Sequence, residues 1–248
     1  MRKQRYLTLE KRLSVPLWTK LAVPLASIVA GFLFSAIFLL ISGESSIEVY
    51  SVMFEGAFGS AYGLSETVVK MIPLMIISVG VAFAFKMQIW NAGGEGQLHI
   101  GAAAATYVVL HLNGCSRFVT VLLAFLAAFI CAGIYGLIPA ILKVKWKVNE
   151  LITCLMLNYV ATFFVSWLIQ GPWKDPTGFA FPRTRKIPSA GELTTFFGTR
   201  IHTGLIIGLA IALALWFVIY KTRWGFEIKL IGAKEKVARY AGMSVNRN

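Results

Sequence analysis

Apolar residues form long runs along this chain, and short polar segments separate them. A helix that crosses a membrane needs about 20 predominantly apolar residues. Runs of suitable length and composition cover residues 21–42, 68–85, 95–112, 118–142, 151–170 and 203–220. The pattern therefore predicts an all-α fold, a polytopic membrane helical bundle with about six spanning helices.

The composition agrees with this fold class and excludes an ordinary soluble domain. Of 248 residues, 57% are hydrophobic and only 14% are charged, with a mean hydropathy of +0.71. A net charge of +13 would suggest nucleic-acid binding in a soluble chain. Beside apolar spans, basic residues more often set membrane orientation. We therefore expect membrane lipid as a partner and no nucleic acid.

The charges between the runs predict the topology of the chain. Residues 1–20 are strongly basic, which is typical of a cytoplasmic N-terminal segment. Residues 43–66 carry acids only, and residues 171–202 are rich in proline and glycine, so we expect both segments to be outer loops. The basic residues of the second loop run against a strict positive-inside pattern. Residues 21–220 would form the transmembrane domain of a multi-pass protein of the cytoplasmic (inner) membrane, and residues 221–248 would be cytoplasmic.

A polar break interrupts the apolar pattern at Ile89–Ala105, where Asn91, Glu95 and Gln97 stand among glycines. Polar groups at membrane depth are costly unless they face protein or water. One interpretation is that the break lines a cavity, and the other is a turn whose glutamate begins the next helix. The small residues that follow favour a helix packed tightly among others.

The fifth run also begins with polar residues. Asn149, Glu150 and Thr153 lie in or just before its first turn, and Asn158 continues close to the same face. Such a polar stripe should face protein or a pathway. Hydrogen bonding between helices explains it equally well. In the fourth run, a four-residue spacing of small residues predicts close helix packing; these are Ala128, Ala132, Gly136 and Ala140.

The carboxyl-terminal segment predicts a short amphipathic helix. Leu230, Val237 and Tyr240 share one face, with Lys236 and Arg239 on an adjacent face. It could lie on the cytoplasmic membrane surface or dock a soluble partner.

We expect no metal site and no catalytic residues. The three cysteines and three histidines lack ligand spacing, and the chain has no metalloprotease motif or nucleophile triad pattern.

Three blocks together resemble one protein family: WNAGGEGQLHIGA at residues 90–102, VNELITCLMLNY at 148–159 and RWGFEIKLIGAKEKVARYAGM at 223–243. They are similar to the permease subunits of ABC importers for simple sugars and nucleosides, in the ribose and branched-chain amino-acid permease superfamily. Details of the blocks favour the nucleoside branch. In the first block, Ala92-Gly93-Gly94 departs from the more usual Ile-Gly-Ala run, which could loosen the turn. The chain also stops soon after the third block, whereas family members continue into further spans, so the resemblance implies a permease truncated at its carboxyl end.

The resemblance implies an importer with separate subunits: two cytoplasmic ABC ATPases, a second permease, identical or different, and an extracytoplasmic substrate-binding protein. The chain lacks a phosphate-binding loop, so ATP would be bound and hydrolysed by the partner ATPases, and the chain itself would be no enzyme and carry no cofactor. The first two blocks would lie along the translocation pathway, with candidates Trp90, Asn91, Glu95, Gln97, Asn149, Glu150, Asn158 and Tyr159. The third block resembles the cytoplasmic coupling helix, which implies ATPase contacts at Gly232, Lys236, Arg239, Tyr240, Ala241 and Gly242.

Alternating access driven by the ATPases would then move nucleosides or simple sugars. Amides would bind the neutral solute, and Trp90, Tyr159 or Trp167 would offer aromatic surface for a base. The alternative is an ion-coupled secondary transporter, in which Glu95 or Glu150 would titrate within the membrane.

Overall fold

A computed structural model describes residues 16–112, 114–178, 181–196, 198–233 and 240. Within these ranges the fold is helical, and the residues outside helices make isolated bridges but no strand. The helices are α1 (Leu17–Ile41), α2 (Ser46–Phe58), α3 (Ala61–Lys86), α4 (Gly94–His111), α5 (Arg117–Trp146), α6 (Glu150–Gln170), η1 (Ser189–Gly191), α7 (Gly204–Lys221) and α8 (Arg223–Ala233). The predicted all-α membrane fold is confirmed.

Five of these helices, α1, α3, α5, α6 and α7, are long and apolar enough to cross a membrane. The sixth predicted span is a helix too, α4, but it does not belong to that group. Its first turns contain Glu95, Gln97 and His99, which lower its hydropathy. The described residues thus give five candidate spans where the sequence pattern predicted about six.

The chain divides into two compact units, residues 1–64 and 65–248. In the first unit, α2 occupies much of residues 43–66, the segment predicted to be an outer loop. It packs on α1 through two hydrogen bonds to carbonyl oxygens, from Ser46 Oγ to Ala36 (2.9 Å) and from the Tyr50 hydroxyl to Phe32 (2.6 Å). The Phe32 and Tyr50 rings also meet edge to face.

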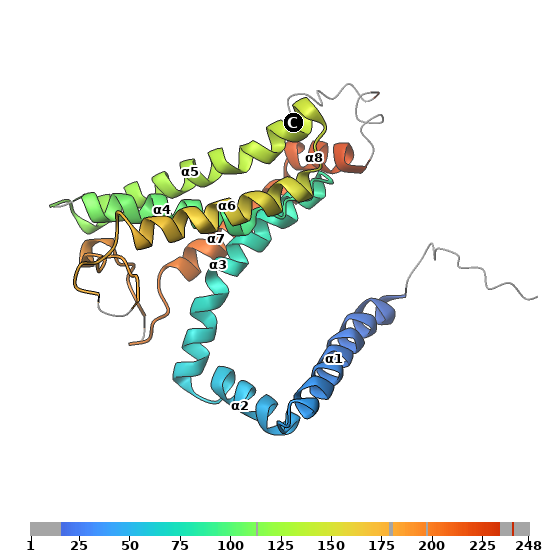
Figure 1. The fold of residues 1–248 in the computed structure, drawn as a ribbon. Coiled ribbons are helices and arrows are strands. Elements are labelled where there is room, and N and C mark those ends of the chain that lie inside the picture. Colours follow the sequence, from blue (N-terminus) through green and yellow to red (C-terminus); the bar gives the residue numbers. More distant parts are fainter. Residues whose placement is uncertain (1–15, 113, 179–180, 197, 234–239, 241–248) are drawn as a thin grey trace, which may run out of the picture. The chain divides into compact units, whose positions relative to one another are not determined.

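In the second unit, α4 packs closely on both α5 and α6 (Figure 1). Small residues permit this approach. A Cβ at Gly101 would lie 3.4 Å from the Ala128 carbonyl oxygen and from the Ala132 Cβ. The small-residue face predicted for α5 therefore does contact a neighbouring helix.

The segment between α6 and α7 is tied down by polar contacts. Lys174 pairs with Thr184 in an isolated bridge. The Arg200 guanidinium donates to both Glu66 carboxylate oxygens, at 3.0 and 3.1 Å. Arg117, in the first turn of α5, donates twice to the Glu192 carbonyl oxygen. This segment therefore has a defined structure over its described residues, although it contains little helix.

Candidate functional site

The polar break folds into a compact turn between α3 and α4. Asn91 Oδ1 accepts hydrogen bonds from the Gly93 backbone N–H (3.0 Å) and from Gln97 Nε2 (3.4 Å). The Cys154 thiol of α6 approaches the same oxygen at 3.8 Å. Asn91 and Gln97, which the sequence singled out, are therefore in contact.

Asn158 of α6 caps the first turn of α4 from a neighbouring helix. The first N–H groups of a helix have no partner within it, and Gly93, at the N-cap position, has no side chain to supply one. Asn158 Oδ1 accepts from the Gly96 N–H at 2.9 Å, and Asn158 Nδ2 donates to the Ala92 carbonyl oxygen at 3.0 Å. Asn158 is buried, and these two hydrogen bonds join α6 to the start of α4.

A cavity of about 600 Å³ begins at this turn and extends between α3, α4, α5 and α7. Among the residues that the structure describes, Asn91 and Gln97 are the polar side chains in its lining, and they lie together at one end. The rest of the lining is aliphatic, aromatic or glycine: Ile76, Ile77, Gly80, Val81, Gly94, Leu98, Gly101, Ala102, Ala105, Phe125, Ala128, Phe129, Ala132, Ile211 and Leu215. Such a site can bind a solute with a neutral polar edge and an apolar or aromatic face.

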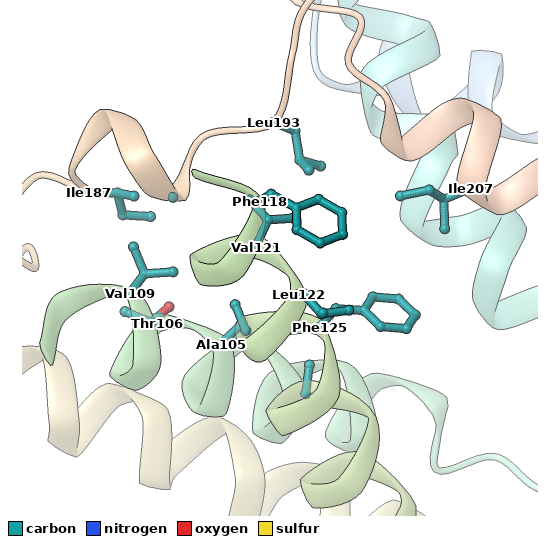
Figure 2. Close-up of a pocket in the computed structure, with 13 residues that line it drawn as sticks. Ala105, Thr106, Val109, Phe118, Val121, Leu122, Phe125, Ile187, Leu193 and Ile207 are labelled. Atoms are coloured by element: carbon teal, nitrogen blue, oxygen red, sulfur yellow. The ribbon is translucent and has the colours of Figure 1, made fainter. Parts of the chain in front are cut away.

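A second cavity, of about 560 Å³, adjoins the first and shares Ala105, Phe125 and Ala128 with it. Its lining is almost entirely apolar. Figure 2 shows Ile207 of α7 pointing across it toward the Phe118 and Phe125 rings of α5. Ile187 and Leu193, from the segment between α6 and α7, complete the lining at the far end. Together the cavities extend from the polar turn to that segment.

The other pathway candidates do not line these two cavities. Trp90 and Tyr159 are 59% and 63% exposed and line neither cavity. Glu95 is exposed on α4. Asn149 is the N-cap of α6, where its Oδ1 accepts from two backbone N–H groups.

Glu150, also a candidate, forms an ion pair with Lys143 at the start of α6. The separation is 2.5 Å, and the carboxylate is the less exposed partner. This ion pair connects the end of α5 to the beginning of α6 and neutralises the Glu150 carboxylate with the Lys143 ammonium group.

Some of the cavity lining could not be predicted from single residues. The aliphatic side chains of α3 and α7, such as Ile76 and Ile211, carry no signal that separates them from lipid-facing residues. The Cys154 contact likewise depends on packing between distant segments. Glycines within the helices, such as Gly80 and Gly101, were the sequence feature that could have indicated this cavity lining.

Of the candidates for ATPase contact, Gly232 lies in α8, and Tyr240 is 93% exposed. The other four lie outside the described residues; they are Lys236, Arg239, Ala241 and Gly242.

Known proteins resemble this chain over most of its length. The guanosine ABC transporter permease NupP of Bacillus subtilis (strain 168) is 35% identical over 92% of this chain and 66% of its own length. The glucose ABC transporter permease TsgB13 of Haloferax volcanii is 33% identical over 96% and 65%, and the nucleoside ABC transporter permease NupB of Lactococcus lactis is 32% identical over 92% and 65%. The chain thus spans just under two thirds of these relatives.

No solved structure matches the chain. Residues 63–248, which contain all three sequence blocks and both cavities, match a family described as "Branched-chain amino acid transport system / permease component". The family match covers most of the chain, and the resemblance stated from the blocks is confirmed. The chain belongs to this permease family.

Proposed function

We propose that this protein is the membrane-spanning permease of an ATP-binding-cassette importer for nucleosides or simple sugars. The two adjoining cavities are the observation that carries the proposal. They offer a volume suited to a small solute, because ligand pockets typically enclose roughly 300–1,000 Å³. The relatives named as guanosine, nucleoside and glucose permeases support this substrate class.

The polar end of the first cavity suits an uncharged solute. Within the described residues, Asn91 Nδ2 and Gln97 Oε1 have no hydrogen-bond partner, so an amide NH2 group and an amide oxygen are free to bind solute. Phe125 and Phe129 offer aromatic surface in the same cavity for a nucleoside base or a sugar face. They replace Trp90 and Tyr159 in this role, because those side chains lie outside the cavity lining.

We further propose alternating access. A substrate-binding protein would deliver solute at the outer end, near the segment between α6 and α7. Two partner ATPases would act at the cytoplasmic end, and a second permease would complete the membrane unit. The amino terminus would be cytoplasmic, in agreement with its positive charge.

The rival function is ion-coupled secondary transport. Such a carrier would need Glu95 or Glu150 to titrate along the pathway. Neither glutamate lines the two cavities described above, and Glu150 is paired with Lys143. The geometry therefore favours the ATP-driven importer.

Uptake by the assembled importer in proteoliposomes tests the proposal. We expect uptake of a radiolabelled nucleoside or sugar to require ATP and the binding protein, and to be indifferent to an imposed proton gradient. Uptake that persists without ATP and follows the proton gradient would establish the carrier instead.

Gln97→Met tests whether the polar end of the first cavity binds the solute. Loss of one neutral hydrogen bond of about 1 kcal/mol should raise the KM for solute roughly fivefold. Leu137→Met, which introduces the same side chain at an exposed position of α5 outside both cavities, is the control and should leave KM unchanged. An equal KM in both variants would show that Gln97 does not bind the solute.

A further inference from the structure

Helix α8 is held against the end of α3 by close contacts. A Cβ at Gly232 would overlap the Lys86 carbonyl oxygen and lie 3.2 Å from the Met87 Cα. The Trp224 ring packs against Phe83, with centroids 5.8 Å apart. Ile228 of α8 is fully buried.

The beginning of α8 is anchored separately, on α7. A Cβ at Gly225 would overlap the Val218 and Ile219 carbonyl oxygens. The Thr222 hydroxyl donates to the Val218 carbonyl oxygen at 2.6 Å, and the Gly225 N–H donates to Thr222 Oγ1 at 3.2 Å. Helix α8 therefore touches the two helices, α3 and α7, that form one wall of the first cavity.

A short, hydrogen-bonded turn connects Lys86 to the polar end of the cavity. The N–H groups of Met87 and Ile89 donate to the Ala84 carbonyl oxygen, at 3.0 and 3.2 Å. Gln88 adopts a left-handed conformation, with φ of 58°. The Asn91 N–H donates to the Ile89 carbonyl oxygen at 3.0 Å, so the hydrogen-bonded turn continues from Lys86 to Asn91.

We propose that the backbone contact between Gly232 and Lys86 is the joint through which movement of α8 is transmitted to Asn91 and the polar end of the cavity. This inference rests on the proposed function, because the movement would originate in the partner ATPases. Only glycine lets the two backbones touch. Any side chain at residue 232 would separate α8 from α3 or displace the turn.

This role differs from the one that the family resemblance implies for Gly232. A residue of the ATPase contact would face outward, whereas the Cβ direction of Gly232 faces Lys86 within the same chain. Substitution should therefore leave ATPase binding intact and weaken the coupling between ATP hydrolysis and transport.

The test compares Gly232→Ala with Gly133→Ala in the complete importer. Gly133 lies in α5, and a Cβ there would meet nothing within 4 Å, so its variant controls for a glycine change in a helix. With Gly232→Ala we expect normal ATPase co-purification and ATP hydrolysis, but uptake per ATP hydrolysed at least about fivefold lower. Gly133→Ala should match the parent protein.

Trp224→Leu provides a second variant, because it weakens the contact of α8 with α3 at Phe83 without adding a steric overlap. It should also lower uptake per ATP hydrolysed. If Gly232→Ala fails to assemble, this variant tests the inference by itself. Unchanged coupling in the assembled variants would overturn the inference. If Gly232→Ala lost ATPase co-purification while Trp224→Leu coupled normally, Gly232 would be assigned to the ATPase contact instead. Absence of ATP-dependent uptake in the parent would instead refute the proposed function.

Discussion

Asn158→Ala should destabilise the packing of α4 on α6. The side chain is only 8% exposed and makes two hydrogen bonds to the backbone at the start of α4. Alanine would leave the Gly96 N–H and the Ala92 carbonyl oxygen without these partners.

The size of the loss follows from those two bonds. Each hydrogen bond between helices in a membrane protein is worth roughly 0.6–2 kcal/mol, and a buried polar group left unpaired costs about 1–3 kcal/mol. We therefore expect the free energy of unfolding to fall by about 2–4 kcal/mol. The loss should exceed that from an exposed helix cap such as Asn149, whose truncation costs about 1 kcal/mol.

Unfolding of the purified protein by increasing SDS in mild detergent, followed by circular dichroism, measures this difference. Thr153→Ala is the control, because over the described residues its hydroxyl bonds the carbonyl oxygen of Asn149, the N-cap of the same helix, and makes no bond to another helix. We expect a loss of no more than about 0.5 kcal/mol there. If Asn158→Ala were as stable as the control variant, the assignment of Asn158 as the cap of α4 would be wrong.

Three further predictions concern other contacts. Gly96→Ala would place a Cβ 2.8 Å from the capping amide oxygen, so we expect a loss of about 1–3 kcal/mol in the same SDS titration. A double-mutant cycle between Lys143→Gln and Glu150→Gln should give a coupling energy of at most about 1 kcal/mol, because Lys143 is 37% exposed and the pair is partly screened. Hydrogen bonds from the Thr177 hydroxyl and backbone N–H hold the pKa of the Asp175 carboxyl below its usual value. The ionised carboxylate should therefore stabilise the segment between α6 and α7 at neutral pH, and this stabilisation should be lost as pH falls from about 4 through the lowered pKa. Hydrogen exchange in that segment should become faster over this pH range. In Asp175→Asn, the exchange should not depend on this titration.

The helices could be predicted because lipid demands long apolar segments with their backbone groups paired internally. The runs at 151–170 and 203–220 agree with α6 and α7 within a residue or so. Helix α2 was missed, because its acids and lack of basic residues were interpreted as an outer loop. Its Ser45 N-cap was a local signal for that helix.

The site was only partly predictable for a different reason. Asn91 and Gln97 are six residues apart, so a local turn brings them together. Asn158 and Gly96 are 62 residues apart, and no local periodicity indicates that they meet. The sequence identified Asn158 as a polar residue that needs a partner, but only tertiary packing decides that the partner is backbone rather than solute.

Passage of solute through the cavity is the central claim, and thiol protection tests it most directly. Ala102 is exposed and lines the first cavity, so Ala102→Cys, with the three native cysteines replaced, places a thiol in that cavity. Ile134→Cys on α5, 60% exposed and outside the cavity lining, is the control. We predict that transported nucleoside or sugar slows labelling at residue 102 and leaves labelling at residue 134 unchanged. Equal labelling with and without solute, in an importer that still transports, would contradict the account.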